Sequence, residues 1–121
     1  MPHRNIVAKE LAGLLGVLAH PQRIRIIEEL RGGERGVSAI QAALGISHSG
    51  VSQHLMILRA HRLVSERREG RQVIYRLRQL ELATWLTEAM RFLEGDSVTT
   101  EQLRKAIKKT RAVWAADDAK N

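Results

Sequence analysis

Apolar residues recur every three or four positions through most of the chain, which predicts a mainly α-helical protein. A first helix is expected over residues 6–18, with apolar positions at 7, 11, 14, 15 and 18. Pro21 suits the first turn of a second helix, which Gly32 and Gly33 end. The buried stripe of this second helix is predicted to be Ile24, Ile27 and Leu30.

Two short helices joined by a tight glycine turn follow. Ser38 and Gln41 fit a capping box at the start of the third helix, and Gly45 permits a left-handed turn at its end. Ser47 is a good N-cap for a fourth helix that runs to about His61. Two helices that follow each other so closely predict a helix-turn-helix.

The fourth helix has two different faces. Its apolar face is expected to enter the core and consists of Val51, Leu55 and Leu58. A second face is small and uncharged and consists of Ser49, Ser52, Gln53 and Met56. This second face carries its hydrogen-bonding groups toward the N-terminal half of the helix.

A β-hairpin is predicted after these helices, from strands over Leu63–Glu66 and Val73–Leu77. Glu69 and Gly70 stand in the place of the hairpin turn. The tip is cationic because Arg67, Arg68 and Arg71 flank the turn. A helix-turn-helix followed by a basic hairpin is a winged helix, which gives a mainly α fold with a β-hairpin wing.

Two more helices complete the predicted fold, so that a five-helix core carries one extra C-terminal helix. The fifth helix covers residues 80–93, with Leu82, Leu86, Met90 and Leu93 on one face, and ends at Gly95 and Asp96. Thr99 and Gln102 fit a second capping box, before a last helix that runs to about Trp114. The apolar stripe of that helix is Leu103, Ala106, Ile107, Thr110, Val113 and Trp114. We expect one main domain over residues 1–96, and an amphipathic extension and tail over 97–121.

Composition and charge narrow the function. The 121 residues carry a net charge of +7, and residues 59–78 hold seven arginines against Glu66 and Glu69. Such a local excess is typical of a polyanion-binding surface, although a solvated basic surface gives the same count. The chain has no cysteine, which excludes disulfides, thiolate chemistry and cysteine-ligated metals. No apolar run approaches a membrane span and no signal peptide is present, so a soluble cytoplasmic protein is expected.

The predicted winged helix suits double-stranded DNA. The major groove admits one α-helix, and the N-terminus of a helix attracts a phosphate through its free N–H groups. The residues expected to contact DNA from the fourth helix are Ser47, His48, Ser49, Gly50, Ser52 and Gln53, and those from the wing are Arg67, Arg68 and Arg71. Gln53 can pair bidentately with adenine, while the arginines can neutralise phosphates or enter the minor groove. The alternative is a winged helix used for protein or RNA contact.

Several segments resemble the ArsR/SmtB family of bacterial repressors. Residues 18–23, LAHPQR, resemble the family's opening L-A-H-P-x-R. Residues 44–55, LGISHSGVSQHL, resemble its recognition segment L-G-L-S-Q-S-x-V-S-H-H-L. The stretch from Arg59 to Leu63 and the wing residues 68–71 and 74–75 also match, except that Arg62 stands where glycine is common. The resemblance covers about residues 6–94.

The resemblance implies a homodimer built from the first and fifth helices and bound to a near-palindromic operator. Residues 1–96 are then expected to be the DNA-binding and dimerisation domain. The interface residues it implies are Leu11, Leu15, Leu82, Leu86, Met90 and Leu93. Family members mostly repress transcription and release DNA when an inducer binds. No membrane partner is implied.

The family's sensor sites are missing from this sequence. The two cysteines of its metalloid site are replaced by Gly36 and Ser38. Its fifth-helix metal site aligns with Gln79, Glu81, Phe92 and Gly95. Of these only Glu81 could be a ligand, and a single carboxylate does not hold a transition metal. The five histidines show no metal-binding spacing, so no metal and no cofactor are expected, and the inducer stays unknown.

Three functional hypotheses remain open. The first is a dimeric repressor that binds DNA sequence-specifically. The second is a sensor of a small molecule or ion, with its site at the dimer interface between the fifth and last helices. The third is an interaction module that does not bind DNA. An enzyme is not expected, because no catalytic constellation is present. The last helix is expected to lengthen the dimer interface, although it could also form an effector surface or touch the DNA flanks.

Overall fold

The computed structural model describes residues 2–94 and 100–120, without the side chains of residues 118 and 120. The chain forms two compact units, Met1–Gln79 and Leu80–Asn121. The predicted boundary between residues 96 and 97 lies outside the described residues and stays a prediction.

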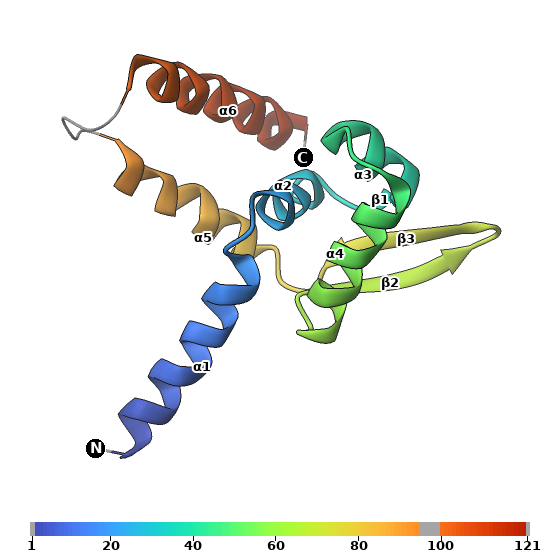
Figure 1. The fold of residues 1–121 in the computed structure, drawn as a ribbon. Helices are drawn as coiled ribbons and strands as arrows, with labels where there is room; N and C mark the ends of the chain where they lie inside the picture. The colour runs from blue at the N-terminus through green and yellow to red at the C-terminus, as the bar shows by residue number, and fades with distance from the viewer. Residues whose placement is uncertain (1, 95–99, 121) are drawn as a thin grey trace. The chain divides into compact units, whose positions relative to one another are not determined.

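The first unit is a winged helix (Figure 1). Its elements are α1 (Pro2–Leu18), α2 (Pro21–Leu30), β1 (Arg35–Gly36), α3 (Val37–Leu44), α4 (His48–Ala60), β2 (Val64–Glu69) and β3 (Gln72–Leu77). The order confirms the predicted helix-turn-helix and wing. The first helix begins four residues earlier than the apolar pattern predicts, because residues 2–5 continue it as polar and exposed turns.

The core of this unit lies where α2, α3, α4 and the sheet meet. Its fully buried side chains are Ile26, Ile27, Leu30, Ile40, Val51, Leu55, Leu58 and Val64. The predicted core face of α4 is therefore confirmed at all three positions. The predicted stripe of α2 is wrong at one position: Ile24 is 41% exposed and Ile26 is buried instead. The helix is rotated so that the adjacent pair Ile26 and Ile27 enters the core.

The turn between α3 and α4 forms as predicted. Gly45 adopts φ +68° and its N–H donates to the carbonyl of Gln41 at 2.9 Å, which closes the end of α3. Ser47 caps α4, since its Oγ accepts from the N–H of Gly50 at 3.1 Å. The predicted capping box at Ser38 is wrong, because α3 begins at Val37 with Gly36 as its N-cap and makes no side-chain cap.

The wing belongs to a three-stranded antiparallel sheet with strand order β1-β3-β2. Both long strands extend further toward the tip than predicted, to the pair Glu69 and Gln72. The turn is therefore Gly70-Arg71 rather than Glu69-Gly70, with a positive φ of 63° only at its first position, which is the pattern of a type II′ turn. The two-residue strand β1 was not predicted, because so short a strand has no alternation to detect.

Arg62 lies in the left-handed region, with φ +58°. It stands between α4 and β2, at the position where the family commonly has glycine. Arg62 therefore adopts the backbone conformation that a glycine would adopt, and its side chain makes this conformation strained.

The second unit consists of α5 (Glu81–Ala89), the 3₁₀ helix η1 (Met90–Leu93) and α6 (Glu101–Lys120). The single predicted fifth helix thus changes to a 3₁₀ turn at Met90. Ala83 and Ile107 are its buried apolar residues among those described. Thr100 caps α6, with its Oγ1 accepting from the N–H of Leu103 at 3.1 Å. The predicted cap Thr99 and the predicted stop at Gly95 and Asp96 lie outside the described residues.

The α6 helix is longer than predicted, since it continues to Lys120 rather than to about Trp114. Its predicted apolar stripe is only partly buried. Ile107 is 5% exposed, whereas Val113 is 56% exposed. No described helix is both long enough and apolar enough to cross a bilayer.

Candidate nucleic-acid interface

The N-terminus of α4 presents a cluster of small polar groups. Ser47, His48 and Ser49 are exposed, and the hydroxyls of Ser47 and Ser49 lie 3.3 Å apart. Ser47 satisfies one of the free N–H groups of the first turn, while the helix dipole leaves partial positive charge there. This end of α4 can therefore accept a phosphate.

Gly50 leaves little room for a larger residue beside the Ser47 cap. A Cβ at this position would lie 3.1 Å from the Oγ of Ser47 and 3.6 Å from the Cδ1 of Ile46. A larger residue would require the Ser47 hydroxyl to shift by a few tenths of an ångström. The expected contact of Gly50 with DNA stays a prediction.

The outer face of α4 is uncharged and open to solvent. Gln53 is exposed and Met56 is 60% exposed, whereas Val51, Leu55 and Leu58 on the inner face are fully buried. Ser52 is half-buried between the two faces. The six predicted α4 residues therefore occupy one end of one helix, and Met56 extends their surface by one turn.

His54 faces inward and was not assigned a role from the sequence. Its Nδ1 accepts from the Nε of Arg23 at 3.3 Å, and its ring lies 4.5 Å from the ring of His20. Partial burial, followed by the nearby His20 and Arg23, lowers the pKa of His54 below its usual value. His54 therefore anchors α4 to α2 in its neutral form.

The LAHPQR motif explains this anchor. His20 caps α2, since its Nδ1 accepts from the N–H of Gln22 at 3.2 Å. Arg23 donates to the carbonyl of Val17 at 3.0 Å as well as to His54, so it connects the end of α1 to α4. These contacts give His20 a structural role.

The wing arginines divide into two kinds. Arg68 and Arg71 lie at the exposed tip and make no ion pair within the described part of the chain. Arg67 instead donates to Glu34 at 2.7 Å and to Glu69 at 2.8 Å. The hydrogen bond from Arg67 lowers the pKa of Glu34. Arg67 thus ties β2 to the segment before β1, and its charge is partly neutralised.

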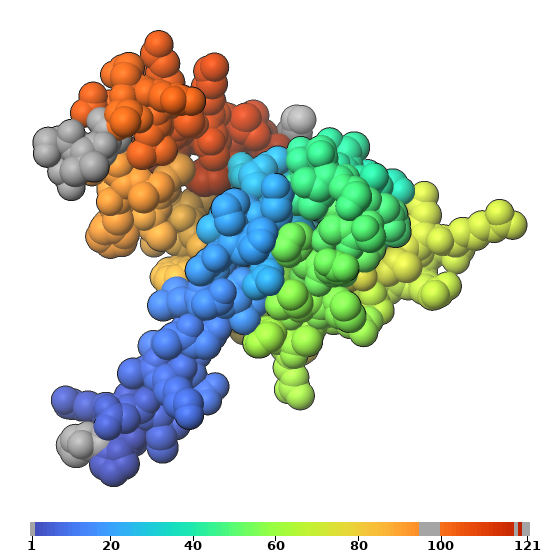
Figure 2. All heavy atoms as spheres, in the orientation of Figure 1, coloured from blue at the N-terminus to red at the C-terminus, as the bar shows by residue number. Residues whose placement is uncertain are grey.

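Figure 2 shows the tip of the hairpin, in yellow, projecting beyond the green surface of α3 and α4 within the first unit. A second set of contacts holds the hairpin near its base. Arg59 at the end of α4 pairs with Glu66 on β2. Burial, together with a hydrogen bond to Glu66, raises the pKa of Tyr75 to about 12. These contacts fix the wing against the C-terminal end of α4.

Sequence reasoning did not find Arg23, Glu34 or Glu66 as partners in this site. A charge pattern shows which residues could pair, but the Arg67–Glu34 bond joins positions 33 residues apart. Only the strand β1, which brings Glu34 to the sheet, places the two together.

The predicted interface residues of α1 are open to solvent. Leu11 and Leu15 are 52% and 47% exposed, and Ile6 and Val7 on the same helix are also exposed. In the second unit Leu82, Leu86 and Met90 are half-buried and Leu93 is exposed. Among the described residues no three histidine, aspartate or glutamate side chains gather as a metal site would require.

Comparison with known proteins gives a consistent result. Residues 20–66 match the family described as bacterial regulatory protein, arsR family. The nodulation protein NolR of Rhizobium meliloti is 32% identical over 109 residues, which cover 90% of this chain and 88% of that protein. The transcriptional repressor SmtB of Mycobacterium tuberculosis is 40% identical over 98 residues, covering 80% and 71%.

A solved structure shares the fold. The homodimeric winged helix-turn-helix DNA-binding domain Mb0332 of Mycobacterium bovis, described as a possible ArsR-family regulator, has a TM-score of 0.67 at 29% identity. The match covers 80% of this chain and 94% of that domain.

Proposed function

This chain belongs to the ArsR family of bacterial regulatory proteins, and we propose that it is a dimeric transcriptional repressor that binds a near-palindromic operator. The outer face of α4 is the main observation that supports DNA binding. Three fully buried anchors hold this helix from inside, so that Ser49, Gln53 and Met56 are presented outward on a rigid rod. An uncharged face of this kind fits the base edges of the major groove.

The wing supplies charge beside this neutral face. Arg68 and Arg71 at the tip are available for phosphates, and the N-terminus of α4 offers a further anion site. Arg67 acts mainly as a positioning residue, because two carboxylates already hold it.

The dimer completes the proposal. The exposed apolar residues of α1, and separately those of the second unit, provide surface for a second copy. In a symmetric dimer two α4 helices would enter successive major grooves about 34 Å apart. Residues 1–96 would then serve DNA binding and dimerisation, while 97–121 extend the interface.

The family is one of regulators rather than enzymes, and we infer neither catalysis nor a resident cofactor for this chain. A cytoplasmic location follows from access to DNA.

Selection of duplexes from a random library tests the proposal, together with sedimentation of the protein alone. We expect a palindromic consensus, steep weakening of binding with salt, and a dimer in solution. A monomer at micromolar concentration, or retention of no duplex at low salt, would refute it. The second outcome would favour an interaction module that does not bind DNA.

A further inference from the structure

The second unit contains a pocket that the DNA-binding proposal does not use. Its volume is about 360 Å³, near the lower end of the roughly 300–1,000 Å³ of ligand sites. Glu94, Arg104, Ile107, Lys108 and Arg111 line it. We propose that this pocket binds a small organic anion, best matched by a phosphate monoester with a short apolar group.

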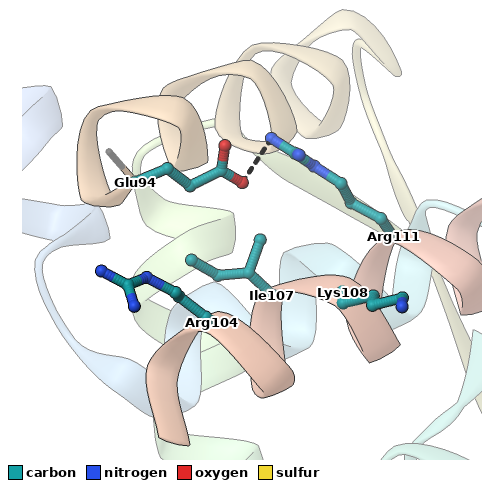
Figure 3. Close-up of a pocket in the computed structure, with 5 residues that line it drawn as sticks. All are labelled: Glu94, Arg104, Ile107, Lys108 and Arg111. Carbon is teal, nitrogen blue, oxygen red and sulfur yellow. Dashed lines mark ion pairs between the residues drawn. The ribbon is translucent and has the colours of Figure 1, made fainter. Parts of the chain in front are cut away.

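The lining is strongly cationic. Arg104, Lys108 and Arg111 follow one another at i, i+4 and i+7, so they share one face of α6 (Figure 3). Like charges at this spacing destabilise a helix slightly, and all three residues are exposed. A ligand that carries negative charge would relieve this repulsion.

One carboxylate opposes the three cations. Glu94, just after η1, pairs with Arg111 at 2.7 Å, and the two side chains point toward each other. Lys108 makes no ion pair with any described residue. The ion pair between Glu101 and Arg104 is weak, because its atoms are 3.6 Å apart and the Glu101 side chain is 69% exposed. A ligand can therefore replace Glu101 as the partner of Arg104. The lining thus keeps two positive charges in excess of Glu94.

These charges select the ligand's chemistry. A phosphate monoester carries about −1.5 to −2 at pH 7 and presents three acceptor oxygens, which suit two guanidinium groups and one ammonium. The pocket is not purely polar, because the buried Ile107 lines it beside the aliphatic stems of Arg104 and Lys108. A bare phosphate would leave this apolar part unused.

The first test is calorimetric titration of the DNA-free protein with phenyl phosphate and with inorganic phosphate. We expect phenyl phosphate to bind more tightly. Lys108→Gln should weaken its binding about tenfold, as the loss of one charge-assisted hydrogen bond implies. Lys105→Gln and Lys109→Gln are matched controls, since both lysines are exposed on α6 but do not line the pocket. Equal losses in lining and control variants would overturn the proposal, as would no binding by the parent protein.

Glu94→Gln gives a result of opposite sign. Removal of the competing carboxylate should tighten phenyl phosphate binding several-fold, whereas a purely structural role of Glu94 would weaken it. Equal affinity for the two phosphates would refute the apolar contact. If the parent protein does not bind phenyl phosphate and Arg104→Gln loses affinity for duplex DNA, the cationic face of α6 contacts DNA instead. Because the titration contains no DNA, its failure leaves the repressor proposal untouched.

Discussion

Helices α4 and α6 are both amphipathic, yet they present opposite kinds of surface. The α4 helix buries Val51, Leu55 and Leu58 completely and turns an uncharged face outward. Among its described residues α6 buries Ile107 alone, and its outward face carries a row of cations.

The number of buried anchors in each helix matches the kind of recognition that the helix can perform. Reading a base edge requires side chains held within about half an ångström, which a helix with three buried anchors can provide. The attraction between a cation and an anion falls off gradually with distance, so it tolerates small shifts of the side chain. A helix with one buried anchor is therefore sufficient to bind an anion. The wing arginines also attract anions without precise positioning, although they lie beside α4 in the proposed interface.

The largest expected effect concerns anchoring itself. Leu55→Ala should lower the free energy of unfolding by about 2–5 kcal/mol, because it leaves a cavity in the core. Ile107→Ala should cost less, since the surroundings of a single anchor can relax. Urea unfolding followed by circular dichroism measures both. Equal losses of unfolding free energy in the two variants would mean that α6 is anchored as firmly as α4, which would contradict the difference described above.

Gln53→Ala should change sequence preference. We expect a loss of about 1–3 kcal/mol for one base pair of each half-site, with other positions unaffected. Anisotropy titrations with single-substitution operators measure it. Lys108→Gln on α6 serves as the control and should leave the base preference unchanged. An unaltered preference in Gln53→Ala would show that α4 reads bases with other residues.

Arg71→Ala should weaken all duplexes about equally. We expect the slope of log affinity against log salt to fall by about 1, because one phosphate contact is lost. Arg67→Ala should change this slope less, since Glu34 and Glu69 already hold that guanidinium. The same slope change in both variants would mean that DNA replaces the two carboxylates as partners of Arg67.

Arg62→Gly should stabilise the first unit. The left-handed φ of +58° is unfavourable for arginine, so glycine should raise the free energy of unfolding by about 0.5–1 kcal/mol. Arg78→Gly, at an exposed position without positive φ, is the matched control and should bring no gain. A destabilised Arg62→Gly protein would show that the side chain makes contacts worth more than the strain.

The smallest effect is a pH dependence at the inner anchor of α4. The pKa of His54 is lowered in the folded state, so the unfolded chain binds a proton more readily. Stability should therefore fall as the pH drops below about 6.5, the ordinary value for histidine, until the folded pKa is reached. His54→Gln, which can still accept from Arg23, should reduce this fall in thermal unfolding between pH 7.5 and 5.5. His61→Gln, at the C-cap of α4, should retain it.

The sequence predicted elements more reliably than contacts. Periodicity located α4 and its three core residues, because the buried face of a helix repeats regularly. It misplaced the core face of α2, where Ile24, Ile26 and Ile27 are all apolar and local pattern cannot choose among them. It also missed β1, whose two residues form a strand only because β3 lies beside them.

Local sequence was sufficient to predict the helix-turn-helix, the Ser47 cap, the neutral face of α4 and the cationic tip. Each depends on residues within a few positions of one another, where local sterics and hydrogen bonding are decisive. Long-range packing was needed to establish that Arg67 is held by Glu34, that His54 faces Arg23 and, in the second unit, that Arg111 pairs with Glu94. These pairs join residues far apart in the chain, and several arginines could have taken each role, so the folded arrangement alone selects the partner.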